Sequence, residues 1–162
     1  MRIRLLFALA VSATIAGLIG AANASNVTSH DPQSIVLALQ DAGYKAILGK
    51  TDEGDPVIDT ASDGNDIRIV MSDCKDHSAC GTSEFVGVWD CSDSIEKCRD
   101  VASDLNNNEN PVHVLLGKDG KTAFTYSYLL YDEAGISEAL LIKNLITFSY
   151  YNSQFTVLVT KK

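Results

Sequence analysis

The side chains best suited to chemistry in this sequence are its cysteines and histidines. Cys74, His77 and Cys80 have a spacing that a zinc site could use, and Asp76 stands beside them. The chain holds four cysteines, an even number, and its start indicates export to an oxidising compartment. Both features favour disulfide bonds over a metal, so we expect no metal site and no cofactor.

The four cysteines are Cys74, Cys80, Cys91 and Cys98, and they allow three pairings. We favour the two local bonds, Cys74 with Cys80 and Cys91 with Cys98. Each short loop would contribute roughly 2 to 2.5 kcal/mol in the chain-entropy model, and a longer closure would gain about 1 kcal/mol more. That difference does not decide the connectivity, because backbone geometry can outweigh it.

Histidines are the candidate general bases near neutral pH. His30 lies close to the start of the expected mature chain, His77 lies in the cysteine-rich segment, and His113 stands between two valines. No Gly-x-Ser-x-Gly nucleophile motif accompanies them. We therefore predict a protein that is not an enzyme. An enzyme with a dispersed carboxylate site stays open as an alternative.

Acidic and aromatic residues offer two further kinds of site. Asp59, Asp63 and Asp66 crowd one predicted hairpin, but Ala61 stands where a calcium loop would need an oxygen ligand. Turn chemistry explains them better. The aromatic residues suit either a sugar or peptide groove or an ordinary sheet–helix core, and we favour the core. They are Trp89, Tyr126, Tyr128, Tyr131, Tyr150 and Tyr151.

The first 24 residues have the organisation of a secretory signal peptide. A basic start, Met1–Arg4, precedes an apolar run, and a small-x-small pattern predicts cleavage between Ala24 and Ser25. An uncleaved anchor is the alternative, since the apolar run is about the minimum spanning length. Its glycines and the cleavage pattern argue against that reading. We expect a periplasmic or secreted bacterial protein, free of the membrane after cleavage.

The charge of the chain restricts its partners. The formal net charge is −8, and loss of the predicted signal peptide leaves 11 basic and 21 acidic residues. Residues 52–104 carry 14 of the acidic residues. Such a surface repels nucleic-acid phosphates and anionic lipid, so we expect neither as a partner. It could attract a cationic protein, although a solvated face that maintains solubility is the simpler interpretation.

Hydrophobic periodicity predicts a single α+β domain. Asp31 and Pro32 open a helix that Gly43 ends. A second helix begins at Ser92 or Asp93 and runs to about residue 105. Alternating apolar residues and turn signals predict an antiparallel sheet of about six strands. The predicted strands cover residues 44–50, 56–61, 67–72, 82–90, 112–116 and 122–131.

The last segment, residues 137–159, suits a long C-terminal helix. A hairpin over residues 147–159 is the alternative, because that half is rich in β-branched and aromatic residues. From Ala139 to Val159 the segment has a single charge, Lys143. A surface helix normally has a broader charged face. We therefore expect a homodimer or partner surface here, made by Leu141, Leu145, Phe148, Tyr151 and Phe155.

Several short segments resemble the YbjN-domain family, whose members are described as candidate bacterial regulators of sensory transduction. The matching segments are turns and core positions spread over residues 32–159. They are Ala42-Gly43-Tyr44, Asp55-Pro56-Val57-Ile58, Gly64, residues 67–74, Asp119-Gly120 and residues 130–136.

The resemblance implies a fold similar to that of type III secretion chaperones, which act as dimers and hold extended client segments. It implies no catalytic residues. This chain departs from the family at Leu105-Asn106-Asn107-Asn108 and at Val112-His113-Val114, where relatives often carry aromatic and arginine residues.

These observations predict a signal peptide (residues 1–24), a flexible mature N-terminus (25–31) and a YbjN-like domain (32–159). The predicted function is non-enzymatic binding of a protein or peptide, either chaperone-like or regulatory. The alternative is an acidic inhibitor of a cationic envelope hydrolase such as lysozyme. Steep loss of binding with salt would favour the inhibitor, and salt-insensitive binding of apolar peptides would favour the chaperone-like role.

Overall fold

The computed structural model describes residues 26–131 and 134–160. The predicted signal peptide and its cleavage site, Ala24 and Ser25, lie outside these residues. The elements are β1 (Asn26–Val27), α1 (Pro32–Asp41), β2 (Ala46–Lys50), β3 (Pro56–Ser62), β4 (Asn65–Ser72), β5 (Thr82–Asp90), α2 (Ile95–Asn107), β6 (His113–Leu116), β7 (Thr122–Leu130), β8 (Ile136–Ser137) and α3 (Glu138–Thr160). Among the described helices, none combines the length and the apolar character that crossing a membrane requires.

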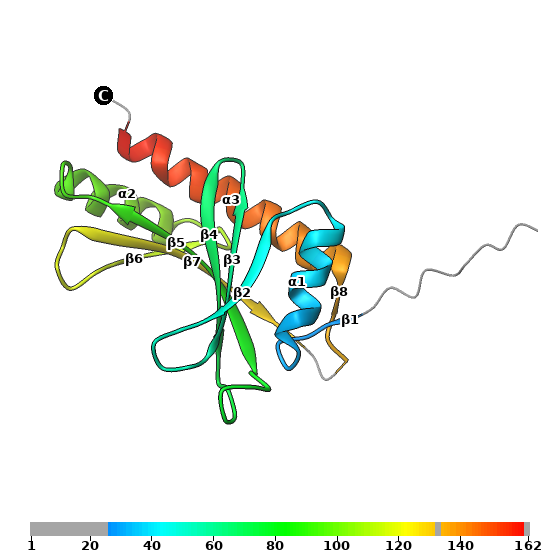
Figure 1. Ribbon diagram of the computed structural model, residues 1–162. Coiled ribbons are helices and arrows are strands. Elements are labelled where there is room, and N and C mark those ends of the chain that lie inside the picture. The colour runs from blue at the N-terminus through cyan, green and yellow to red at the C-terminus, as the bar shows by residue number, and fades with distance from the viewer. Residues whose placement is uncertain (1–25, 132–133, 161–162) are drawn as a thin grey trace, which may run out of the picture.

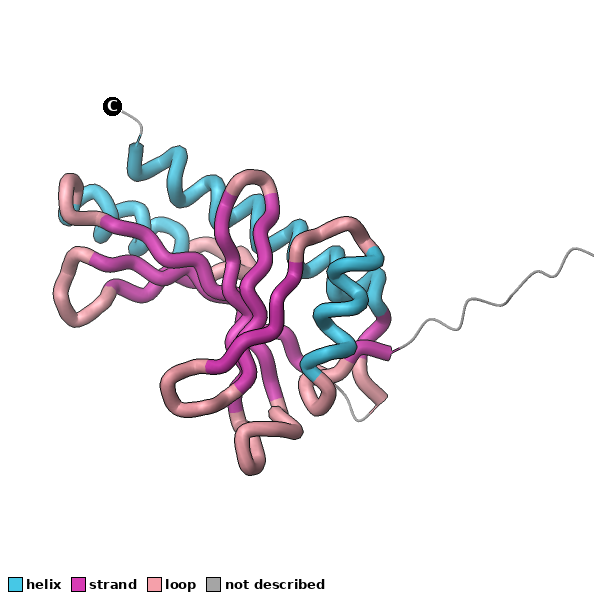
Figure 2. Tube along the Cα trace, viewed as in Figure 1, coloured by secondary structure: helices cyan, strands magenta, loops and turns pink. Residues whose placement is uncertain are grey.

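Six of the described strands form one antiparallel sheet in the order β2-β3-β4-β5-β7-β6. β3 and β4 are joined by a two-residue turn at Asp63 and Gly64, which have φ angles of 52° and 78°. Positive φ at both positions is typical of a type I′ turn, whose twist matches that of the strands. Figure 2 shows how the twist of the sheet turns β6 and β7 away from β2 and β3. The α+β prediction is confirmed.

The two shorter helices begin differently. α1 begins as predicted, because the Asp31 carboxylate accepts a hydrogen bond from the Gln33 backbone N–H at 3.2 Å. α2 begins at Ile95, later than predicted, and its N-cap residue Ser94 makes no side-chain cap. The predicted start at Ser92 or Asp93 was wrong. The Ser92 N–H instead binds the Asp90 carboxylate at 2.8 Å, forming a turn before the helix.

The third helix, α3, runs diagonally across the sheet, from α1 and β8 at one end to α2 at the other (Figure 1). It is continuous through residues 147–159, so the predicted helix is confirmed and the hairpin alternative is wrong. Alternate side chains of the strands face this helix and form the core, as in Ile67, Ile69 and Phe85. All three helices therefore pack on one face of the sheet.

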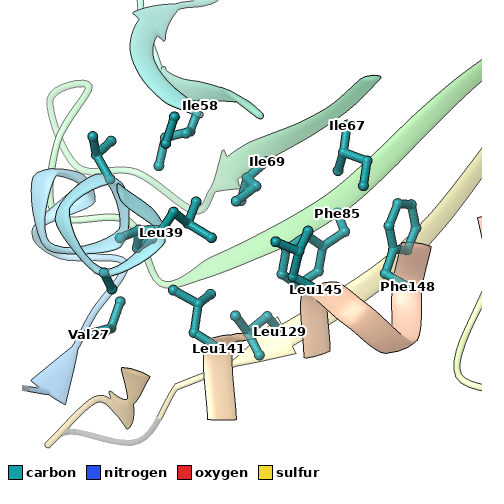
Figure 3. Packing of buried hydrophobic residues seen from close by; sticks show 14 of the residues in the cluster. Val27, Leu39, Ile58, Ile67, Ile69, Phe85, Leu129, Leu141, Leu145 and Phe148 are labelled. Atoms are coloured by element: carbon teal, nitrogen blue, oxygen red, sulfur yellow. The ribbon is translucent and has the colours of Figure 1, made fainter. Parts of the chain in front are cut away.

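The main core lies between α3 and the middle of the sheet (Figure 3). Leu141, Leu145 and Phe148 project from α3 toward the strands, and the Phe148 ring stacks on Phe85 with their centroids 5.6 Å apart. A second apolar cluster joins α2 to the C-terminal half of α3 and includes Phe155. Because α3 is long enough to contribute residues to both clusters, it joins them in one domain.

A polar contact between the sheet and α3 lies beside the second cluster. The Asn152 side-chain oxygen, fully buried, accepts hydrogen bonds from the Trp89 indole N–H at 3.1 Å and from the Thr125 hydroxyl. Gly87 lies directly beneath these groups, where a side chain would collide with them. These hydrogen bonds join α3 to β5 and β7, and the Asn152 side-chain nitrogen has no hydrogen-bond partner among the described residues.

The segment predicted to be flexible, residues 25–31, is described from Asn26 onward, where it packs against the rest of the domain. Val27 pairs with Ile136 in the small β1–β8 sheet and is buried in the main core. The Ser29 hydroxyl, also buried, donates to the Cys80 carbonyl. The apolar valine is stabilised by burial, which outweighs the entropy of a free terminus.

Candidate binding surface

The cysteines form two local disulfide bonds, Cys74–Cys80 and Cys91–Cys98, the pairings that the sequence favoured. The first closes the loop between β4 and β5, and the second ties the end of β5 to α2. His77 does not join the cysteines, because its Nδ1 lies 2.8 Å from the Asp55 carboxylate. The described residues contain no group of three potential metal ligands. The cysteine-rich loop is therefore organised as a cross-linked turn.

The prediction of a partner surface on the last helix was wrong, because its residues lie on the face of the helix that packs against the sheet. Leu141, Leu145, Phe148 and Phe155 are fully buried against the sheet, and Tyr151 is half-buried against the same core. Their helical spacing places them in one apolar stripe along α3, and this stripe packs against the sheet of the same chain. The exposed apolar residues of α3 lie on its outer face, and they are Leu140, Ile146, Tyr150, Val157 and Leu158.

The aromatic residues that could have lined a groove are divided between the two faces of the sheet. Trp89 packs on the helix side and is bonded to Asn152. Tyr131 packs against the main core, with its hydroxyl 2.9 Å from the Ser83 hydroxyl. Tyr126 and Tyr128 lie on the opposite face, and Tyr150 is on α3. The sheet thus separates residues that the sequence grouped together.

Ionisation of Tyr131 should destabilise the fold in alkali. Burial raises the pKa of Tyr131 to about 12, and the hydrogen bond with Ser83 lowers it only in part. An unfolded tyrosine ionises near pH 10, so between about pH 10 and 12 the unfolded chain has lost a proton that the folded chain keeps. The free energy of unfolding therefore falls as pH rises through this window. Urea unfolding across the window measures the slope, which Tyr131→Phe should reduce; an unchanged slope would contradict the assignment.

The face of the sheet away from the helices carries a patch built from three strands. Cross-strand register places its side chains in three rows: Glu84 opposite Tyr128, then Val86 with Tyr126 and His113, then Val88 with Phe124 and Leu115. These residues alternate with the buried residues of β5, β7 and β6, so they point outward. We call these eight residues the three-strand patch. In the described part of the chain, no helix covers this patch.

Large apolar and aromatic groups of the patch are exposed to solvent. Val88 and Leu115 are each 60% exposed and Tyr128 is 58% exposed, which is high for such side chains. The His113 and Tyr126 rings are 5.7 Å apart, and Tyr126 meets Tyr128 edge to face at the same distance. Contacts between neighbouring rings therefore favour one defined arrangement of the three side chains.

A hollow adjoins the patch on the side of β4 and β3. Its volume is ≈ 490 Å³, and it is walled by Val86 and Val88 together with Asp59, Asp66 and Arg68. The Arg68 guanidinium lies 2.8 Å from the Asp59 carboxylate, and both side chains are more than half exposed. The Asp59 carboxylate balances the positive charge of Arg68 at the border of the patch. Asp66 then gives the wall of the hollow a net negative charge.

The first row of the patch, Glu84 and Tyr128, also carries negative charge. Glu84 accepts a hydrogen bond from the Ser72 hydroxyl at 3.4 Å, and it stands directly across from Tyr128. The negative charge of Glu84 is the main reason that the pKa of Tyr128 lies above its ordinary value, with smaller contributions from burial and Tyr126. The patch therefore combines aromatic surface with negative potential at one end.

The sequence missed several members of this surface. The alternation predicts that Phe124 shares a face with Tyr126 and Tyr128, but Val88 was assigned only to a strand, with no face stated, and Leu115 was not singled out. The signal was present in the alternation, because Phe85 and Val114 are buried while Val88 and Leu115 are one or three positions away on the other face. Only the pairing of β5 with β7, across the intervening α2 and β6, brings the rows together.

Comparison with known proteins supports the fold only. No protein-family model matches the chain, and no curated protein does. Among solved structures, the chain is similar to YbjN, described as a candidate transcription regulator from E. coli. The two share 14% sequence identity and a TM-score of 0.52 over 80% of this chain and 89% of that one. The protein has a YbjN-like fold, as the resemblance in sequence implied.

Proposed function

We propose that this YbjN-like chain is a non-enzymatic domain that binds a segment of another protein or a peptide on the three-strand patch. One observation carries the proposal: a rigid, apolar and aromatic surface is left exposed on the face of the sheet that the helices do not cover. Exposed patches of this kind mark interaction sites in water-exposed proteins. Tyrosine is also among the residues enriched in binding surfaces.

The acidic charge limits the kind of partner. The structural neighbour is described as a transcription regulator, but the net charge of −8 of this chain opposes binding to nucleic-acid phosphates. We propose a protein or peptide partner in the periplasm or outside the cell, reached after removal of residues 1–24. The two disulfide bonds support that location, since such bonds persist in oxidising compartments.

Substitution of the exposed apolar row should weaken binding of peptides. The probes are fluorescent unstructured peptides of mixed apolar and basic composition, and fluorescence anisotropy measures their affinity. Leu115→Ser and Val88→Ser remove apolar surface from the patch, and together they should raise Kd about tenfold, equivalent to about 1.4 kcal/mol. Leu37→Ser on α1, where Leu37 is 52% exposed, is the matched control and should leave Kd unchanged. Loss of binding in the control, with none in the patch variants, would refute the proposed surface.

The inhibitor alternative draws support from the same face. Glu84 belongs to the patch and Asp66 lies in the adjoining hollow, so a cationic hydrolase could dock there through charge attraction. Such docking would lose affinity steeply between low and physiological salt, because exposed charges are screened. The alternative of a carboxylate enzyme has less support. Asp59 in the hollow is held by Arg68, and that hollow is a broad surface depression rather than a buried pocket.

We also propose that the outer face of α3 joins two copies of the chain. This face exposes Leu140, Ile146 and Tyr150, and it borders a groove of ≈ 550 Å³ between α1 and α3. Ile146→Glu should place a charge in that interface and convert the dimer to a monomer, because an unpaired charge is costly to bury. Light scattering at micromolar concentration measures the mass. A monomer mass for the unmodified protein would contradict the proposal.

A further inference from the structure

We propose that the partner of the three-strand patch is an extended segment with an arginine or lysine four residues from an apolar side chain. The basic side chain lies on Tyr126 and Tyr128 beside Glu84, and the apolar side chain lies on the row formed by Val88, Phe124 and Leu115. This inference rests on the proposed function and specifies the chemistry of its ligand.

The spacing follows from the register of the sheet. Glu84 and Tyr128 form the first row, and Val88 and Phe124 form the third row, four residues further along β5 and β7. At about 3.3 Å per residue the two rows are about 13 Å apart. An extended ligand lying along the strands covers the same distance in about four residues.

The first row is suited to a cation for two reasons. The Glu84 carboxylate faces outward across from Tyr128, whose ring is 58% exposed and is braced edge to face by Tyr126. A guanidinium or ammonium group over exposed aromatic rings is attracted by their negative faces. The nearby carboxylate adds a direct charge partner. Arg68, which lies across from Val86 of the middle row, is paired with Asp59 and does not compete for Glu84.

The opposite end of the patch does not offer an equivalent cation site. Asp90 lies one row beyond Val88, but its carboxylate accepts the Ser92 N–H at 2.8 Å and lies near both Asp119 and Lys121. Its cross-strand partner is Thr122, not an aromatic residue. The third row itself is apolar, with Val88 and Leu115 each 60% exposed around the half-buried Phe124. Among the eight patch residues the carboxylate therefore lies at the first-row end and the apolar groups at the third-row end. This asymmetry sets which end of the ligand binds at which row.

Three peptides of about 11 residues test the spacing. The first carries Arg four residues from Phe in an otherwise Gly/Ser sequence, the second carries the same residues two apart, and the third has Gln in place of Arg. Anisotropy at low salt should give a Kd for the first peptide about tenfold lower than for the other two. Raising the salt from about 20 to 500 mM should weaken the first peptide and leave the third unchanged.

Two matched variants locate the basic side chain. Glu84→Gln should abolish the preference for Arg over Gln, while Asp90→Asn removes a charge from the far end of the same face and should keep that preference. Both side chains lie on the outer face of the sheet, so circular dichroism and urea unfolding should show intact folds. Equal loss of preference in the two variants would mean a general charge effect and would overturn the assignment.

The outcomes separate this inference from the proposed function. If the three peptides bind equally well and Leu115→Ser still weakens them, the patch binds peptides but the basic anchor is refuted. If no peptide binds the unmodified protein, the proposed function fails as well. If Leu115→Ser instead abolishes a dimer seen by light scattering, a second copy occupies the patch and the assignment of an extended basic ligand is refuted.

Discussion

Replacement of Gly87 by alanine should lower the free energy of unfolding by about 3 kcal/mol. A Cβ atom at this position would lie 2.6 Å from the Thr125 hydroxyl and closer still to the Asn152 amide oxygen. Both partners are fully buried, so they cannot move aside into solvent. Overpacking a core costs about 1–3 kcal/mol, and each buried hydrogen bond that is lost costs about 1 kcal/mol more. Urea unfolding at neutral pH gives the midpoint and slope from which the difference is obtained.

A second glycine in the same sheet provides the matched control. At Gly49 a Cβ would meet the Val57 side chain at 3.6 Å and the Val57 carbonyl oxygen at 3.8 Å, both ordinary contacts, so Gly49→Ala should change stability by less than about 1 kcal/mol. Asn152→Ala combined with Gly87→Ala should cost less than the sum of the two single changes, because the collision with Asn152 is removed together with its amide while the contact with Thr125 remains. Additive effects, or a Gly87→Ala protein as stable as the control, would contradict the packing described here.

Replacement of Phe148 by alanine should cost about 3–5 kcal/mol of stability. The side chain is 1% exposed and its ring stacks on Phe85, so truncation removes apolar contacts from α3 and the sheet and leaves a cavity. This is a large share of the roughly 5–15 kcal/mol that stabilises a typical domain. Thermal or urea unfolding measures the change, and Phe148→Leu should recover part of the loss by refilling the cavity.

The same experiment decides between the two roles considered for this helix. If Phe148 were an interface residue, its truncation would reduce the mass of the assembly with little effect on the unfolding of each chain. Tyr150, two positions along and 58% exposed, is the control, and Tyr150→Ala should change stability by no more than about 0.5 kcal/mol. A stable Phe148→Ala monomer would restore the interface that the sequence suggested.

The alternation of buried and exposed residues along β5, β6 and β7 explains why one face of the sheet is left exposed there. α1 and α2 follow from amphipathic segments and α3 from a largely apolar one, and the connections place all three helices on the same side. A sheet buried on one face by helices can leave its other face in water only if that face is polar, small or functional. Here it is aromatic and apolar in its third and middle rows. An exposed face of this composition is unusual for a protein surface in water. For this reason we regard the patch as a candidate binding site.

Local signals were sufficient to predict most elements. Asp31, Pro32 and Gly43 define α1 through capping and backbone preference, which act within a few residues. The Asp-Gly turn predicts the β3–β4 hairpin for the same reason. Residues 137–159 were predicted as a helix from a 3.6-residue period, and the continuous α3 confirms this. Cysteine spacing pointed to local pairs, because six or seven residues are enough to close a bond.

Position in space was beyond the reach of local signals. The period of α3 identified an apolar stripe, but not whether the sheet or a second chain covers it, because burial depends on what folds against it. The docking of Val27 beside Gly135 joins residues more than 100 positions apart. The three-strand patch needs the long-range pairing of β5 with β7, which no nearby residue encodes. The amino-acid sequence by itself determined the elements, their caps and the charge of the chain; the tertiary structure decided which apolar residues became core and which became the binding surface, because that choice is made by non-local packing.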